Sequence, residues 1–358
     1  MEDCWMKVLI VGCGSIGRRH ARNAAALGAE VALCDLSMER MCELGGEIGA
    51  SEYYVDIENA ASTSGASAAV VATPSNLHID PARILLKAGI HVLMEKPLCS
   101  DLSEALELKK ILDESPLVFM MGHTYRFRAE WQEVKRLIDE KPLGRIYSAE
   151  FIGGWYLPDW HVRDDYRREY AAQKRLGGGV LLTSLSHFLD IVSWFFGDIS
   201  KISGARMQLS ELELDVDDAV VCTLKTVDGV GVTLIEDFFS RCPRRTFRIN
   251  AKYGYLEADF NRKTISVWDA RSKRIHPDEF DADATNEQYF RILEDGVMYD
   301  LSPDTFPLQY SGNDAYKAEM AFFIEATENG QLVHALGIDA GIRVLQALNH
   351  AGLCDWTD

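Results

Sequence analysis

The fold of the N-terminal part of this 358-residue chain is decided by the stretch Lys7-Val8-Leu9-Ile10-Val11-Gly12-Cys13-Gly14-Ser15-Ile16-Gly17. Its apolar run predicts a buried strand, and the amphipathic residues after the glycines predict a helix. In such a turn the first glycine allows a tight bend, the second lets the backbone approach a pyrophosphate, and the third lets the helix pack closely on the strand. The N–H groups at the helix N-terminus favour phosphates. We therefore expect a dinucleotide to contact Gly12, Gly14, Ser15, Ile16 and Gly17.

A carboxylate follows the second predicted strand, residues 30–34. Asp35 lies 18 residues after Gly17, where it can accept hydrogen bonds from an adenosine ribose. The same carboxylate would repel a 2′-phosphate, so we expect NAD rather than NADP. A glycine turn that binds nothing is the alternative, but its position between strand and helix, together with Asp35, favours the cofactor.

Outward from this turn, short apolar runs alternate with amphipathic segments up to residue 121. Strands are predicted at residues 7–11, 30–34, 68–73, 91–94 and 117–121, and helices at 15–27, 37–47, 76–88 and 102–112. This alternation is typical of a doubly wound parallel sheet, the Rossmann arrangement. Residues 1–121 are therefore predicted to form the NAD-binding domain.

The pattern changes after residue 122. Helices are predicted at residues 129–140, 181–195 and 317–328, and strands at 146–153, 219–226, 230–238, 246–251, 255–259 and 264–268. Short turns between consecutive strands indicate an open, mostly antiparallel sheet. Residues 122–358 are thus predicted to form an α+β domain for substrate binding and oligomerisation, with residues 269–307 as a loop.

Composition limits the classes of partner. The net charge of −18 and pI of about 4.9 disfavour nucleic acid. The eight cysteines are scattered without a CxxC pair, which favours a reducing cytoplasm, and we expect no metal site. Glu2 and Asp3 stand where a signal peptide would carry positive charge, and no uncharged stretch approaches the length of a membrane span.

Two further motifs follow predicted strands of the first sheet. The segment 73–78 follows the third strand, and Glu95-Lys96-Pro97 follows the fourth. Because ligands bind beyond the carboxyl ends of parallel strands, these residues are expected to face the cofactor. A capped loop and a solvated lysine are the alternatives. The expected cofactor contacts here are Thr73, Pro74, Asn76, His78, Glu95 and Lys96.

A triple glycine, residues 177–179, precedes a helix that carries Thr183 and His187 on one face, four residues apart. Histidine is suited to general acid–base catalysis near neutral pH, and Lys96 could donate a hydrogen bond to a substrate hydroxyl or accept its proton. A histidine in an apolar helix is also often a core residue. Lys96, His187 and Thr183 are the predicted catalytic residues.

Taken together, the glycine turn, the Thr73-Pro74 segment, Glu95-Lys96-Pro97 and the triple glycine with its histidine helix resemble the Gfo/Idh/MocA oxidoreductase family in order and approximate spacing. The resemblance implies a Rossmann domain followed by an α/β domain whose open sheet packs against another subunit. It also implies that Lys96 and His187 face the nicotinamide and that the Lys96–Pro97 bond is cis. Many members have aspartate where this chain has Thr183, which leaves the group that orients His187 open.

The segment 155–170 is rich in aromatic residues, arginine and aspartate. Aromatic faces suit sugar rings, and arginine suits a carboxylate or phosphate. A surface or subunit-interface loop is the alternative, and Arg126 could equally be an ion-pair partner. The predicted substrate contacts, besides the catalytic residues Lys96, Thr183 and His187, are Tyr125, Arg126, Trp160, His161, Arg163 and Arg167.

These observations predict an NAD-dependent oxidoreductase that transfers a hydride between nicotinamide and a hydroxyl-bearing carbon of a sugar, sugar acid or nucleotide sugar. Two alternatives are an enzyme that uses bound NAD for a transient internal oxidation, and a non-catalytic sensor of NAD or a metabolite. A homodimer or homotetramer formed through the C-terminal sheet is expected, in the cytoplasm.

Overall fold

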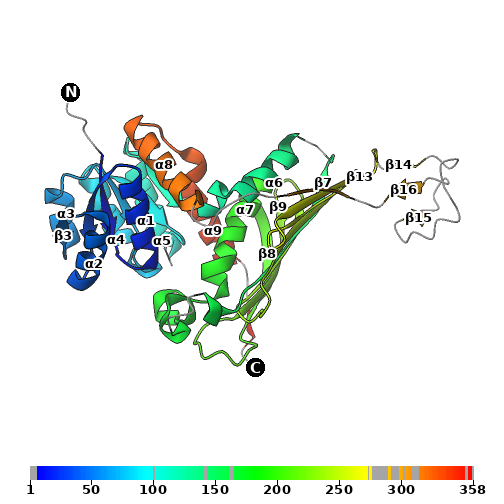
Figure 1. Ribbon diagram of the computed structural model, residues 1–358, viewed down its shortest axis with the longest axis horizontal. Coiled ribbons are helices and arrows are strands. Elements are labelled where there is room, and N and C mark those ends of the chain that lie inside the picture. Colours follow the sequence, from blue (N-terminus) through cyan, green and yellow to red (C-terminus); the bar gives the residue numbers. More distant parts are fainter. Residues whose placement is uncertain are drawn as a thin grey trace.

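The computed structural model describes residues 6–99, 101–140, 143–160, 165–272, 274–275, 289–291, 298–300, 303–307, 314–350 and 354–356. Two large sheets organise the molecule (Figure 1): a parallel sheet near the N-terminus and a long, open sheet formed mainly by the middle of the chain. His161 and Arg163 lie outside the described residues.

The first sheet has six parallel strands in the order β3-β2-β1-β4-β5-β6. The apolar runs become strands because helices cover both faces, so that consecutive side chains are buried. The strand order reverses between β1 and β4, and this is the position at which doubly wound sheets bind ligands. The predicted Rossmann arrangement is confirmed. The strands are β1 (Lys7–Val11), β2 (Glu30–Cys34), β3 (Glu52–Tyr54), β4 (Ala68–Val71), β5 (His91–Glu95) and β6 (Phe119–Gly122).

Side-chain caps fix where several helices of this domain begin. The Ser37 hydroxyl and the Asp56 carboxylate accept hydrogen bonds from the backbone N–H groups of Arg40 and Asn59. Strand β3 and helix α3 were not predicted, because a three-residue edge strand and a seven-residue helix carry too short a pattern. The helices are α1 (Ser15–Ala26), α2 (Met38–Ile48), α3 (Ile57–Thr63), α4 (Ile79–Lys87) and α5 (Leu102–Asp113).

The second sheet has nine strands in the order β17-β13-β12-β11-β7-β10-β9-β8-β18. It is mostly antiparallel, as predicted, but β10 pairs with β7 and β18 with β8 in parallel. Strand β8 was missed because its side chains do not alternate clearly between buried and exposed. The strands are β7 (Ile146–Gly154), β8 (Ile199–Met207), β9 (Ala219–Thr226), β10 (Gly231–Asp237), β11 (Arg244–Ala251), β12 (Gly254–Asp259), β13 (Thr264–Asp269), β17 (Asp304–Pro307) and β18 (Cys354–Trp356).

The loop predicted for residues 269–307 is wrong where the structure describes this region. Strand β17 pairs with β13, and three short strands form a small separate sheet in the order β14-β16-β15. These strands are only two to four residues long, too short for a recognisable alternation. They are β14 (Arg274–Ile275), β15 (Tyr289–Arg291) and β16 (Met298–Asp300).

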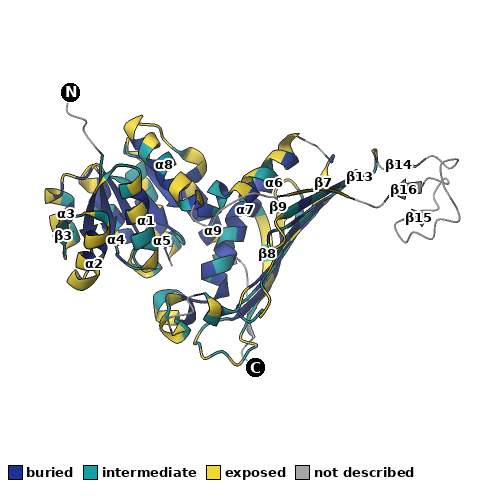
Figure 2. Ribbon diagram, viewed as in Figure 1, coloured by how far each residue is buried: buried dark blue, intermediate teal, exposed yellow. Residues whose placement is uncertain are grey.

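Helices α6 (Ala129–Glu140) and α7 (Ser186–Phe196) cover one face of the nine-stranded sheet (Figure 1). Trp131, Phe151 and Phe247 are fully or almost fully buried at this contact. A π-helical turn, Leu181–Leu185, leads directly into α7. The helical stretch Lys174–Phe196 is long and apolar enough to cross a membrane, but 72% of its most apolar window is buried inside the molecule. Figure 2 shows α7 as largely buried, which is typical of a core helix.

The last two helices return to the first domain. Met320 and Phe323 of α8 (Asp314–Glu328) are buried in one core with Val8 and Ile10. Helix α9 (Ile338–His350), which was not predicted, packs against α5 and β6. The C-terminal helices thus complete the N-terminal domain, although they follow the second sheet in sequence.

Candidate active site

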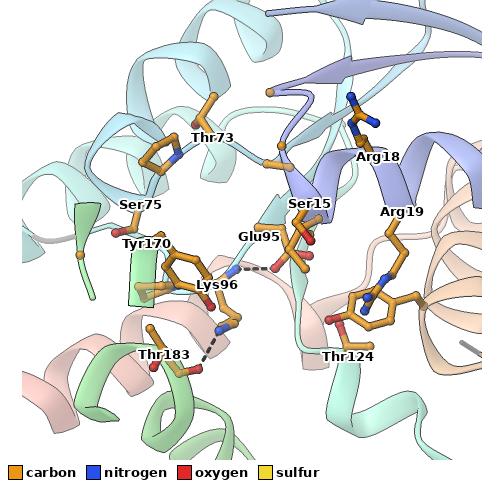
Figure 3. Close-up of a pocket in the computed structure, with 18 of the residues that line it drawn as sticks. Ser15, Arg18, Arg19, Thr73, Ser75, Glu95, Lys96, Thr124, Tyr170 and Thr183 are labelled. Carbon is orange, nitrogen blue, oxygen red and sulfur yellow. Dashed lines mark hydrogen bonds between the residues drawn. The ribbon is translucent and has the colours of Figure 1, made fainter. Parts of the chain in front are cut away.

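A cavity of about 1970 Å³ lies between the carboxyl edge of the first sheet and the second domain. Residues from the glycine turn, from the ends of β2, β4 and β5, and from the second sheet all line it. Figure 3 shows Lys96 pointing toward Thr183, with Ser15 drawn near Glu95. A single cavity therefore extends from the glycine turn to the second sheet.

The glycine turn has the geometry that a bound pyrophosphate requires. Gly12 has a φ of 93°, a conformation that side-chain-bearing residues rarely adopt, and a Cβ on Gly17 would lie 1.8 Å from the Gly12 carbonyl oxygen. A Cβ on Gly14, by contrast, would meet nothing within 4 Å. The turn therefore needs Gly12 and Gly17 for its own shape, while Gly14 leaves open space that fits phosphate oxygens at the N-terminus of α1.

Asp35 lies in the cavity wall at the end of β2. Its Oδ2 accepts a hydrogen bond of 2.7 Å from the Cys13 N–H, and its Oδ1 accepts one of 2.8 Å from the Ser37 N–H. These bonds hold the carboxylate next to the glycine turn, where a ribose would lie.

Some residues of the segment after β4 line the cavity, and others hold the neighbouring loops together. Thr73 and Pro74 line the cavity, as predicted, together with Ser75. His78 is almost fully buried, and its ring nitrogens lie 2.9 Å from the Pro97 carbonyl oxygen and 2.8 Å from that of Thr73. The imidazole therefore ties the β4 loop to the β5 loop rather than facing the cofactor groove.

Two other predicted contacts, Asn76 and Gly17, do not line the cavity. Ser75 and Leu77 are among the lining residues, whereas Asn76 between them is not. Gly17 shapes the turn from behind through its contact with Gly12. The remaining predicted cofactor contacts, Gly12, Gly14, Ser15, Ile16, Asp35, Thr73, Pro74, Glu95 and Lys96, all line the cavity.

Lys96 connects the two domains at the centre of the cavity. Its Nζ donates a hydrogen bond of 2.8 Å to the Thr183 carbonyl oxygen, and the Lys96–Pro97 bond is cis, as the family resemblance implied. Burial lowers the pKa of Lys96, while the Glu95 carboxylate raises it again in part. A lysine with a lowered pKa, fixed at a cavity wall, can exchange a proton with a substrate hydroxyl.

Thr183 acts through its backbone. Its hydroxyl donates a hydrogen bond of 2.6 Å to the Gly179 carbonyl oxygen, one helical turn earlier, while its own carbonyl accepts from Lys96. The Thr183 side chain thus supports the turn after the triple glycine, while its carbonyl positions Lys96.

His187 lies flat against Tyr125, with ring centroids 4.1 Å apart and an interplanar angle of 6°. Both residues line the cavity. Burial, together with the charge of Lys96, lowers the pKa of His187 well below its ordinary value, so the imidazole is neutral at pH 7. A neutral imidazole held by stacking can donate or accept a hydrogen bond at the reacting oxygen.

A buried network behind Lys96 was not predicted. His20 Nε2 lies 2.7 Å from Glu95 Oε1, and the Thr124 hydroxyl donates to Glu319 Oε2 at 3.1 Å. Burial opposes ionisation of Glu95, but the hydrogen bond from His20 lowers its pKa overall. Burial and the nearby Glu95 charge raise the pKa of Glu319 well above its ordinary value. No local pattern could reveal this group, because α1, β5 and α8 are distant in sequence.

Arg126 does not belong to the cavity. Its Nε and Nη2 donate to Asp190 Oδ2 and Oδ1 at 2.8 and 2.7 Å, and its Nη1 donates to the Ala335 carbonyl at 3.0 Å. Arg126 and Asp190 are both buried. Of the two roles considered from the sequence, the structure gives Arg126 that of an ion-pair partner between α7 and the C-terminal segment.

Replacing Arg126 by methionine is expected to destabilise the fold by about 3–5 kcal/mol, because it leaves the buried Asp190 carboxylate without its partner. Urea unfolding would measure the loss. Arg167→Met is the matched control: Arg167 pairs with Asp165 and Glu213 at the surface, and such pairs contribute roughly 0–1 kcal/mol. Equal losses for the two variants would contradict the assignment.

The segment 155–170 contributes to the cavity in part. Trp160 lines it and packs edge-on against Phe238, with ring centroids 5.3 Å apart. Arg167 forms surface ion pairs instead, whereas its neighbour Arg168 is a lining residue. The cavity also contains charged residues that the sequence did not indicate, Arg128, Glu130, Glu236 and Arg245.

Comparison with known proteins agrees with this geometry. Residues 6–123 match the oxidoreductase family with an NAD-binding Rossmann fold, and residues 131–257 match the GFO/IDH/MocA C-terminal domain. Levoglucosan dehydrogenase of Pseudarthrobacter phenanthrenivorans is 23% identical over 343 residues, which cover 86% of this chain and 84% of that enzyme. UDP-N-acetylglucosamine 3-dehydrogenase of Acidithiobacillus ferrooxidans is 24% identical over 268 residues, which cover 74% of this chain and 77% of that enzyme.

A solved structure of levoglucosan dehydrogenase, in complex with NADH and levoglucosan, matches this fold with a TM-score of 0.77 at 18% identity. The match covers 97% of this chain and 96% of that one, and so includes both sheets. With both of its domains matched and the glycine turn, Asp35 and Lys96 gathered around one cavity, the chain belongs to the GFO/IDH/MocA family of NAD-binding oxidoreductases.

Proposed function

We propose that the protein oxidises a hydroxyl-bearing carbon of a sugar, sugar acid or nucleotide sugar, or reduces the matching carbonyl, with NAD as the hydride carrier. The observation that carries this proposal is the position of Lys96, whose Nζ lies 2.8 Å from the Thr183 carbonyl in the wall that His187 also lines. A lysine with a lowered pKa next to a neutral histidine is suited to proton transfer at a substrate oxygen.

Bound NAD supplies the hydride acceptor. During oxidation, Lys96 in its neutral form accepts the proton of the substrate hydroxyl as the carbon gives up its hydride. Tyr125 fixes the plane of the His187 imidazole, which hydrogen-bonds the same oxygen and restricts the substrate's orientation. The Thr183 carbonyl keeps the lysine amine at the domain boundary throughout. In the reverse direction the lysine returns its proton to the alkoxide.

The substrate class is supported by the lining and by the relatives. Trp160 and Tyr170 add aromatic rings to the cavity lining, as sugar-binding sites commonly do. The two relatives compared above are named as dehydrogenases of levoglucosan and of UDP-N-acetylglucosamine. We extend this class, a hydroxylated ring, to the present protein.

The open sheet supports a homo-oligomer. Along β9 buried residues alternate with exposed ones, and α6 and α7 cover a single face of the sheet among the described residues (Figures 1 and 2). Val221 and Tyr147 are exposed on strands of this sheet. We propose that the second face packs against another copy of the chain, and that the protein works in the cytoplasm, where its cysteines, free among the described residues, stay reduced.

The test is to mix the protein with NAD and matched panels of sugars, sugar acids and nucleotide sugars and to follow NADH absorbance. Turnover of one class identifies the reaction and the substrate class. If no class changes NADH absorbance although a thermal shift confirms NAD binding, net oxidation is contradicted. That result would favour internal redox cycling or a sensing role.

A further inference from the structure

Two ionisable side chains of the second sheet line the cavity and influence each other through their charges. Arg245, at the start of β11, and Glu236, at the end of β10, both line the cavity from the second sheet. The predicted anion contacts lay elsewhere, in the segment 155–170. These two residues are therefore a site that neither the glycine turn nor the Lys96–His187 pair explains.

The guanidinium of Arg245 lies near two aromatic rings, and at least one of its N–H donors has no hydrogen-bond partner among the described residues. Its Cζ lies 5.9 Å from the ring centroid of Tyr125 and 5.7 Å from that of Phe260. Its Nη2 is buried and has no hydrogen-bond partner among the described residues. A buried guanidinium N–H without a partner costs free energy, which a ligand that accepts its hydrogen bond would recover.

Glu236 lies over the backbone of β7. A Cβ on Gly153 would come within 1.7 Å of Glu236 Oε2, so the carboxyl occupies the space that the missing side chain leaves. That oxygen is buried and also has no partner among the described residues. Burial raises the pKa of Glu236 to about 8, although the charge of Arg245 lowers it in part. At pH 7 the group is mostly protonated and adds little negative charge.

Three cationic side chains of the cavity lining lie close enough to His187 to act on its ionisation. Lys96, Arg128 and Arg245 all lower the pKa of His187 through their charges. Arg128 donates to the Glu130 carboxylate at 2.5 Å, which compensates its charge. Because Glu236 is mostly protonated, it balances little of the charge of Arg245.

We propose that Arg245 binds a carboxylate of the substrate, with Glu236 hydrogen-bonding the same end of the molecule, so that the substrate is a sugar acid. A planar guanidinium fork matches a carboxylate through two parallel hydrogen bonds. Tyr125 contacts both Arg245 and His187, so the carboxylate is bound close to the carbon that reacts. This inference rests on the proposed oxidoreductase function and specifies its substrate.

The test is direct binding to the complex with NADH at pH 7, measured by the cofactor's fluorescence and by calorimetry. D-glucuronate and D-glucose form one probe pair, and D-galacturonate and D-galactose a second. We expect the acid of at least one pair to bind about tenfold to a hundredfold more tightly than its neutral sugar, the range that a hydrogen bond to a charged group contributes.

Arg245→Gln should abolish this preference. Arg245→Lys should keep part of it, because lysine retains the positive charge but cannot form the two parallel hydrogen bonds of a guanidinium. Arg244→Gln is the matched control, because Arg244 is the exposed neighbour in β11 and does not line the cavity. Thermal unfolding of each variant confirms that it is folded.

Equal binding of acid and neutral sugar, no binding of either in both pairs, or a preference that survives in Arg245→Gln would overturn the inference. Tighter binding of D-glucose 6-phosphate than of either acid, with the same dependence on Arg245, would also overturn it in favour of a phosphate. If the acid binds through Arg245 but no sugar or sugar acid changes NADH absorbance, the proposed oxidoreductase function fails while the carboxylate site stands.

Discussion

Lys96→Met is expected to lower kcat by about 10²- to 10⁴-fold, the contribution of a positioned general acid–base group. Methionine keeps the length and the apolar stem of the lysine but cannot accept the proton of the substrate hydroxyl. It also loses the hydrogen bond to the Thr183 carbonyl across the domain boundary. Stopped-flow measurement of NADH formation, with the substrate identified by the panel, would give the rate of the chemical step.

The control for this variant is Lys87→Met, which removes an exposed lysine from the end of α4. Lys87 does not line the cavity, so Lys87→Met should leave both kcat and NAD affinity nearly unchanged. The pH profile adds a second check. Since burial lowers the pKa of Lys96, the wild-type rate should rise with pH through a value below the ordinary 10.5 of lysine, and this step should vanish in Lys96→Met. A variant that keeps both the rate and the step would exclude Lys96 as the acid–base group.

Gly14→Val is expected to weaken NAD binding by about a hundredfold or more, roughly 2.7 kcal/mol, while the fold keeps its stability. A Cβ at Gly14 meets no protein atom within 4 Å, and its φ of −72° suits any residue. The added side chain therefore fills the space in which the pyrophosphate would lie. Isothermal titration with NAD measures the loss, and urea unfolding measures the stability.

Gly46→Val supplies the comparison for the second prediction. Gly46 lies in α2, and a Cβ there also meets nothing within 4 Å. This variant should bind NAD normally and be as stable as the wild type. If Gly14→Val bound NAD as tightly as Gly46→Val does, the cofactor would have to lie away from the glycine turn.

The sequence predicts a strand or helix correctly where the side chains of that element are buried on one face only or on all sides. Strand β2 was predicted with the bounds that it has, residues 30–34, because a central parallel strand is a continuous apolar run. Strand β8, whose side chains are mostly half-buried, gave no such pattern. Helix α8 was predicted from its periodicity, but its return to the first domain was not, because an apolar face does not identify the surface that it covers.

The sequence likewise indicated some residues of the candidate site and missed others. Gly12, Asp35 and Lys96 could be identified because each directly follows a strand, and parallel strands bring their carboxyl ends together. Arg126 failed as a substrate contact because its partner, Asp190, is 64 residues away. Arg245 and Glu236 were missed because they reach the cavity from a mostly antiparallel sheet, and the sequence does not reveal which strand ends of such a sheet lie together.

Helix α9 serves two cores at once. Its Ile342 and Leu345 are buried in a cluster with the first sheet, and its Val344 and Ala347 in the cluster of the second. Loss of packing in either half therefore removes support from the same helix and so from the other half. The two domains should consequently melt in a single cooperative transition rather than in two. A destabilising mutation in one sheet should therefore lower the free energy of unfolding of the whole chain.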